Sequence, residues 1–212
     1  MKNKIASITA LVSLIATASF SFTNSSFAED AKSAHHHGDD NYHGGSSQKD
    51  KILIEKLKKQ IEEVAKTKRT EQANLANFDD LDFNVFSNQK WEKLNRSHHK
   101  DVIVHWPDGH VTNGIETHIA DLKAMFVFAP DTRIKEHSIR IASEEWTAVY
   151  GFMEGTFTQP MAIGDGKTIP PTGKAYRIGM ITIGHWTKEG VMDEEWLQWD
   201  NQSFMSQIGV GQ

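Results

Sequence analysis

Two stretches decide the fold of this 212-residue chain: Ala175-Tyr-Arg-Ile-Gly-Met-Ile-Thr-Ile-Gly-His-Trp186 and Val191-Met-Asp-Glu-Glu-Trp-Leu-Gln-Trp199. Both are rich in β-branched and aromatic residues, and a short glycine-containing turn separates them, which is the pattern of paired antiparallel strands. Similar stretches, Arg133–Ile141 and Thr147–Thr158, precede them. The second half of the chain is therefore predicted to be mainly long strands.

Helical periodicity dominates the chain before these strands. Ile54, Leu57, Ile61 and Val64 recur at spacings of three and four, which predicts an amphipathic helix over residues 51–68. The apolar stripe covers only about two heptads, too short for an autonomous coiled coil, so we expect it to pack on the domain or on a second copy. Further helices are predicted over 70–86, 89–96, 115–128 and 202–208, with a short strand over 101–106. Helices followed by strands indicate an α+β domain with helices on one face of a curved sheet.

The first 28 residues have the anatomy of a secretory signal peptide. A cationic start, Met1 to Lys4, is followed by an apolar run from Ile5 to Phe22 and by the small-residue site Ser26-Phe27-Ala28. The alternative is a membrane anchor, which the serines and threonines of the run disfavour. Cleavage after Ala28 leaves 184 of the 212 residues. We therefore expect a periplasmic or secreted protein with no membrane association after processing.

Residues 29–50 are expected to form a flexible linker, because they contain almost no large apolar side chains. His35, His36, His37 and His43 lie in this segment together with acidic residues. Such a tract either binds zinc, copper or nickel loosely or serves as a solvated spacer. The globular domain is then expected to follow the amphipathic helix and to span residues 69–212.

Composition excludes several classes of function. The formal charge is −5, and no dense stripe of Lys and Arg occurs, so a nucleic-acid partner is not expected. The chain has no cysteine, which excludes disulfide scaffolds, thiolate metal sites and cysteine nucleophiles. No phosphate-binding glycine loop, GxSxG motif or dinucleotide fingerprint is present.

From Leu75 to Gly211 the chain resembles the SnoaL-like ester cyclases and polyketide cyclases of the nuclear transport factor 2-like superfamily. The motifs that carry this resemblance are Phe83-Asn-Val-Phe-Ser-Asn88, Val102-Ile-Val-His-Trp-Pro-Asp-Gly109, Phe128-Ala-Pro-Asp131, Ile169-Pro-Pro-Thr-Gly-Lys174 and Glu194-Glu-Trp-Leu-Gln-Trp-Asp-Asn-Gln-Ser203. The resemblance implies a cone-shaped α+β barrel, in which a strongly curved antiparallel sheet wraps on N-terminal helices around an apolar pocket. It also implies pairing of two copies through the open face of the sheet. Val149, Met153, Ile178 and Ile181 are expected on that face, so a homodimer is predicted.

The same resemblance implies cofactor-free chemistry, in which a carboxylate and a histidine exchange protons with a substrate held between apolar walls. Asp200 and His105 occupy the corresponding positions and are the expected catalytic residues. Asp200 could instead only cap the terminal helix, and His105 could be a structural histidine at a strand end. Many relatives carry Asp or Asn directly after the tryptophan, where this chain has Leu197.

Alternation along the last strand assigns the expected ligand-binding residues. A period of two places Glu194, Trp196, Gln198 and Asp200 on one face and Glu195, Leu197 and Trp199 on the other. The first set is expected to line the pocket, joined by Trp106. No metal site is expected in the domain, because its histidines form no HxH or HxxxH pair, and His98 and His99 are expected on the surface at a helix end.

These observations predict an exported domain that binds a small apolar or amphipathic molecule in its barrel, with cyclase-, isomerase- or hydrolase-like acid/base chemistry. The alternative is a non-catalytic ligand-binding or envelope stress module. A polyketide substrate is disfavoured by export, because activated acyl substrates are made in the cytosol.

Overall fold

The computed structural model describes residues 47–210, and the predicted signal peptide and the histidine tract lie outside this range. The described chain begins with helix α1 (Gln48–Asp80), which continues into a short π-helix, η1 (Leu81–Phe86), and a 3₁₀ helix, η2 (Trp91–Arg96). The other helices are α2 (Ile115–Phe128) and α3 (Asn201–Gln207). The strands are β1 (His98–His105), β2 (Val111–Asn113), β3 (Arg133–Ser143), β4 (Trp146–Thr156), β5 (Met161–Ala162), β6 (Thr168–Ile169), β7 (Ala175–Trp186) and β8 (Met192–Trp199).

The helices α1 and η1 replace the two separate helices expected from the sequence. No glycine or proline interrupts residues 65–80, so nothing ends the helix between the two predicted segments. The helix begins three residues earlier than predicted, because Ser47 and Asp50 form a capping box with reciprocal side-chain to backbone hydrogen bonds.

The first half of α1 makes no contact that buries its apolar stripe. Ile54, Leu57, Ile61 and Val64 are all between 45% and 68% exposed, so this stripe does not pack on the domain. The second half is anchored: Phe78 is fully buried, and Glu71 Oε1 accepts a hydrogen bond of 3.0 Å from the backbone N–H of Glu144.

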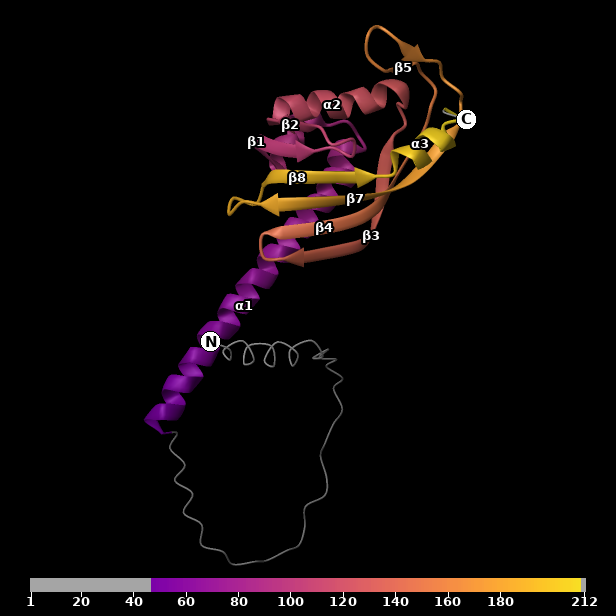
Figure 1. Ribbon diagram of the computed structural model, residues 1–212. Coiled ribbons are helices and arrows are strands. Elements are labelled where there is room, and N and C mark those ends of the chain that lie inside the picture. Colours follow the sequence, from indigo (N-terminus) through magenta and orange to yellow (C-terminus); the bar gives the residue numbers. More distant parts are fainter. Residues whose placement is uncertain (1–46, 211–212) are drawn as a thin grey trace, which may run out of the picture. The chain divides into compact units, whose positions relative to one another are not determined.

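Six strands form one sheet in the order β2-β1-β8-β7-β4-β3 (Figure 1). All neighbouring pairs are antiparallel except β1 and β8, which are parallel. A second, two-stranded sheet pairs β5 with β6. The predicted α+β architecture, a curved sheet with helices before it, is confirmed.

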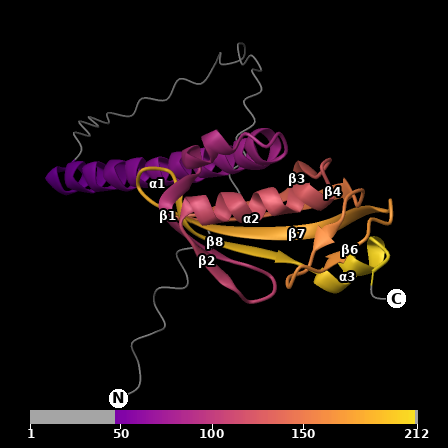
Figure 2. The same cartoon turned by 90° about the horizontal axis from the view of Figure 1, so that it is seen from above.

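The helices α1 and α2 lie on the same side of the sheet (Figure 2), where α1 and η1 contact β3 and α2 contacts β1. The core lies between these helices and the inner face of the sheet. The expectation that Val149, Met153 and Ile178 lie on the open face of the sheet is wrong: they are at most 3% exposed and belong to this core, because the helices cover the face to which they point. Ile181 alone of that set is on the open face, at 44% exposed. None of the helices within residues 47–210 combines the length and the apolar composition needed to cross a bilayer.

Candidate functional site

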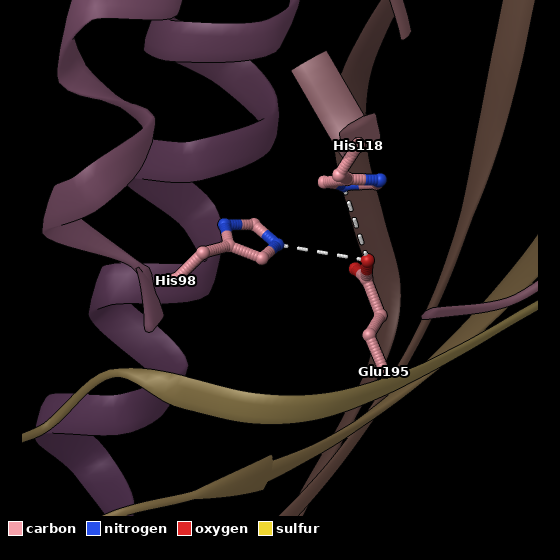
Figure 3. A group of neighbouring side chains, drawn as sticks. All are labelled: His98, His118 and Glu195. Atoms are coloured by element: carbon pink, nitrogen blue, oxygen red, sulfur yellow. Dashed lines mark ion pairs between the residues drawn. The ribbon is translucent and has the colours of Figure 1, made fainter. Parts of the chain in front are cut away.

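Three polar side chains from three different elements meet inside the domain (Figure 3). His98 begins β1, His118 lies in the first turns of α2, and Glu195 lies in the middle of β8. All three are 2–3% exposed. Nε2 of His98 is 3.6 Å and Nε2 of His118 is 3.4 Å from the same carboxylate oxygen, Oε2 of Glu195. We refer to these residues as the interior cluster.

The local sequence explains why each side chain points inward. On β8, Glu195 alternates with exposed or half-buried neighbours and shares the inner face with the buried Leu197. On α2, His118 lies one turn before Leu122 on the buried side of the helix. On β1, His98 has the same parity as the buried Val102 and Val104, and the pairing of β1 with β8 shifts register between His98 and Ile103.

Burial and mutual proximity determine the charges of the interior cluster. Burial lowers the pKa of His118 to about 4, so this imidazole is neutral at neutral pH. Burial alone would raise the pKa of Glu195, but the neighbouring His98, and then His118, outweigh it and hold that pKa below its usual value. The cluster therefore contains a carboxylate deep in the protein.

A small cavity of about 30 Å³ adjoins the interior cluster. Such a volume holds one or two water-sized groups. Its remaining walls are mostly apolar, and they include Leu81, Phe86, Leu122, Ile134, Met180 and Leu197. Met125 and Trp199 also line the cavity and are only half-buried, so the cavity approaches the surface between α2 and the end of β8.

A second carboxylate, Asp82 of η1, lines the same cavity. Burial raises the pKa of Asp82, although a hydrogen bond of 2.7 Å to its Oδ2 from Nε2 of His137 offsets part of the effect. Nδ1 of His137 lies 2.8 Å from Asp79, so both ring nitrogens face carboxylates. Gly151 leaves room for this ring, because a Cβ there would lie 3.0 Å from Cδ2 of His137 and 2.5 Å from a backbone oxygen.

The structure brings three of the expected site residues together, but on the outer face of the sheet. Nε2 of His105 lies 2.8 Å from Oε1 of Glu194, and the His105 ring stacks on Trp196 with centroids 4.7 Å apart. Gln198, on the same face of β8, is exposed. The alternation predicted for β8 is present, but the face expected to line the pocket points away from the interior.

The two remaining expected site residues have other positions. Asp200 is exposed and caps α3, since its Oδ1 accepts a hydrogen bond of 3.0 Å from the backbone N–H of Ser203. It does not line the interior cavity. Trp106 is buried with its ring centroid 5.9 Å from that of His118, and its indole N–H donates to Thr112. Asp200 and His105 are therefore not brought to a common cavity.

The residues that form the interior cluster were not selected by sequence reasoning. The expectation that His98 lies on the surface at a helix end is wrong, because β1 starts at His98 and the side chain is 2% exposed. One signal was available for Glu195. On β1, Val102 and Val104 are both apolar, whereas the alternate positions Asp101, Ile103 and His105 are mixed. This favours an outward position for His105 and for the β8 residues on its face, and an inward one for Glu195.

The family model of the SnoaL-like polyketide cyclases matches residues 80–208, which is more than half of the chain. The chain belongs to this family. The match begins where α1 ends and contains the sheet, α2 and the interior cluster. The resemblance stated from the sequence motifs is thus confirmed.

Solved structures assigned as polyketide cyclases have the same fold as this SnoaL-like domain. One from Jannaschia sp. CCS1 has a TM-score of 0.57 at 16% identity, with 66% of this chain and 94% of that chain covered. IdmH from Streptomyces antibioticus has a TM-score of 0.54 at 20% identity, covering 65% and 99%. A protein from Xanthomonas campestris has a TM-score of 0.58 at 12% identity, covering 66% and 99%. A search of curated proteins finds no match to this chain.

Proposed function

We propose that this SnoaL-like domain binds a small amphipathic carbonyl compound, with the carbonyl at the interior cluster, and exchanges a proton on the carbon beside it. The observation that carries the proposal is the interior cluster itself. Oε2 of Glu195, Nε2 of His98 and Nδ1 of His118 are buried without hydrogen-bond partners. Buried polar groups without partners are costly, and such groups beside a cavity are typical of binding sites.

The residues around the cavity divide into two roles. An imidazole N–H of the interior cluster, such as the unpartnered Nδ1 of His118, is placed to donate to the carbonyl oxygen, where negative charge develops when a neighbouring C–H bond breaks. Asp82 is positioned to take the proton, and His137 orients its carboxylate. The electron pair of the broken C–H bond forms the C=C bond of the enolate, and return of a proton from Asp82 completes the exchange. The raised pKa of Asp82 suits this role, because proton exchange is fastest when the pKa lies near the working pH.

The size of the cavity limits which part of the ligand fits beside the interior cluster. A volume of about 30 Å³ accommodates a carbonyl group but not a ring system. The apolar remainder of the ligand therefore extends toward the surface beside Met125, whose flexible side chain can move to admit it. Cyclase-type chemistry on such a molecule begins with the same enolate.

The experiment follows deuterium exchange beside the carbonyl of cyclohexanone in D₂O by proton NMR. We expect the wild-type protein to accelerate exchange and Asp82→Asn to lose about 10²- to 10⁴-fold of the acceleration. Asp200→Asn is the matched control, because this carboxylate lies outside the cavity, and it should exchange as the wild type does. Binding of cyclohexanone without accelerated exchange would remove the acid/base chemistry and leave the non-catalytic binding module.

The proposal includes export, since the predicted signal peptide lies upstream of the family domain. The mature protein is expected to begin at Glu29. N-terminal sequencing of the protein from the producing cells tests this expectation. A chain that keeps Met1 would contradict processing and favour the membrane anchor.

A further inference from the structure

In the interior cluster, Nε2 of His98 and Oε2 of Glu195 are buried close together, and neither atom has a hydrogen-bond partner. Nε2 of His98 and Nε2 of His118 lie 3.6 Å and 3.4 Å from Oε2 of Glu195. Both distances are longer than the donor–acceptor distance of a normal N–H to O hydrogen bond, which is about 2.9 Å. Yet both imidazoles direct a ring nitrogen at this one oxygen (Figure 3). A cation held between these three ligand atoms would account for the arrangement.

The neighbouring serine favours the tautomer of His98 that carries its proton on Nδ1. The Ser97 hydroxyl donates to the backbone oxygen of Leu94 at 3.1 Å, so its oxygen is left to accept from Nδ1 of His98 at 3.0 Å. A neutral His98 therefore presents a bare lone pair at Nε2. This lone pair and the lone pairs of Glu195 Oε2 face each other in a buried site, which is unfavourable unless a cation lies between them.

The same hydrogen bond is the usual support of a metal-binding histidine. Metal-ligating imidazoles almost always donate their second ring N–H to an oxygen, which fixes the tautomer and the orientation of the ring. Ser97 is 1% exposed and supplies this oxygen. His98 is therefore held as a ligand before any ion arrives.

The spacing of the three ligand atoms fits a small cation. One ligand atom from each residue lies within 4.8 Å of the others. A tetrahedral ion with bonds of about 2.0–2.1 Å separates neighbouring ligand atoms by about 3.3 Å, close to the two observed nitrogen–oxygen distances. The adjoining cavity leaves room at the open position for one further ligand, such as water.

We propose that His98, His118 and Glu195 bind one divalent transition-metal ion, with zinc as the first candidate. Two imidazoles and one carboxylate, without thiolate, form a borderline ligand set that suits Zn²⁺, Co²⁺, Mn²⁺ or Fe²⁺.

This inference rests on the proposed function in one respect: it names the group that receives the carbonyl oxygen. An enolate oxygen beside the Glu195 carboxylate would bring two negative charges together in a buried site. A divalent ion removes this repulsion and polarises the carbonyl. The binding of the ion itself requires no substrate and is tested without one.

The test titrates the mature protein with Zn²⁺ by calorimetry and with Co²⁺ by visible absorption. Because the tract of His35, His36, His37 and His43 is a second candidate for metal binding, all four are changed to serine in the reference protein. We expect one Zn²⁺ per chain and a Co²⁺ absorption band of the intensity typical of four or five ligands. A folded reference protein that binds no Zn²⁺ and shows no Co²⁺ band would overturn the inference.

Variants of that reference protein locate the site. Glu195→Gln should weaken Zn²⁺ binding by about 100-fold or more, and Ser97→Ala by about 10- to 100-fold. Glu194→Gln is the matched control on the adjacent, outward-facing carboxylate and should bind as the reference does. Circular dichroism shows that each variant is folded, and unchanged binding by a folded Glu195→Gln would place the ion elsewhere.

The outcomes also separate the inference from the proposed function. Exchange of cyclohexanone that persists after chelation, in a protein that binds no Zn²⁺, overturns the metal site and keeps the acid/base chemistry. Zn²⁺ binding that depends on Glu195, in a protein without any exchange activity, keeps the metal site and overturns that chemistry.

Discussion

Glu194 and Glu195 are neighbours in the chain and lie on opposite faces of β8. Glu194 pairs with His105 at 2.8 Å on the outer face, where both side chains remain partly exposed. Glu195 lies 3.6 Å from His98 on the inner face, where both are almost completely buried. Two identical side chains thus have different environments, and the difference makes them a natural pair of variants.

Zinc should stabilise the domain through Glu195 and not through Glu194. An ion that binds only the folded state raises the free energy of unfolding, by about 2.7 kcal/mol at a free concentration 100 times the Kd. We expect Zn²⁺ to raise the melting temperature of the wild type and of Glu194→Gln equally, and to leave that of Glu195→Gln nearly unchanged. Calorimetric melting with and without EDTA measures this, and equal shifts in all three proteins would contradict it.

The arrangement of these two carboxylates shows how far sequence reasoning reaches. Alternation follows from strand geometry, so the division of β8 into two faces could be predicted from the sequence. Which face points inward depends on the helices that cover the sheet, and α1 and α2 are far from β8 in the chain. The resemblance to the family implies Asp200 and His105 as the catalytic pair, and neither residue lines the interior cavity.

The interior cluster could not be predicted because its members are distant in sequence and come together only in the folded domain. His98 is the first residue of β1, next to an irregularity in the pairing with β8, and no short sequence motif predicts either feature. His118 and Glu195 are 77 positions apart and meet only when α2 packs on the sheet. The α+β class, in contrast, depends on periodicities that each segment carries by itself.

Asp200 should act as a helix cap. Asn is as good an N-cap residue as Asp, so Asp200→Asn should change the free energy of unfolding by only a few tenths of a kcal/mol, whereas Asp200→Ala should cost about 1 kcal/mol. Loss of the cap should lower the stability of the whole domain, because α3 leads directly into Ile208, which is fully buried in the core. Denaturant unfolding of the two variants measures both values. Equal stability of the Ala and Asn variants would show that the cap contributes nothing.

The stability of the domain should fall as the pH rises, because of His137. Burial alone would lower the pKa of this imidazole, but the hydrogen bonds to Asp82 and Asp79 outweigh it and raise that pKa above 6.5. The charged groups that face the ring are these two aspartates, and Arg140 lies 2.7 Å from Asp79. A raised pKa contributes stability that is complete below pH 6.5 and is lost as the pH rises through the folded-state value.

The pH dependence is measured against a variant that lacks the imidazole. Each unit by which the pKa is raised corresponds to about 1.4 kcal/mol of stability between the two limits of pH. The free energy of unfolding of the wild type should therefore decrease from slightly acidic to alkaline pH by more than that of His137→Gln. Parallel curves for the two proteins would mean that His137 has the same pKa in the folded and unfolded states.

The outer face of the sheet is expected to pair two copies of the chain. Large apolar side chains are exposed on it along β1, β3, β4 and β7, namely Ile103, Ile139, Ile141, Trp146, Ile181 and Ile183. An antiparallel sheet with apolar residues on both faces needs cover on both, and the helices cover only the inner one. The exposed stripe of α1 is available as an auxiliary contact in the same assembly.

Charged substitutions distinguish the contribution of the outer sheet face to dimer formation from that of the α1 stripe. Ile139→Lys with Ile181→Lys should convert a wild-type dimer to a monomer, because two lysines opposite their symmetry mates would have to be buried. Both positions are at least 44% exposed in the single chain, so folding itself should be little affected. Ile61→Lys, on the helix stripe, should weaken the dimer without abolishing it. Light scattering at micromolar concentration distinguishes the species, and a monomeric wild type would show that the apolar outer face has no partner copy.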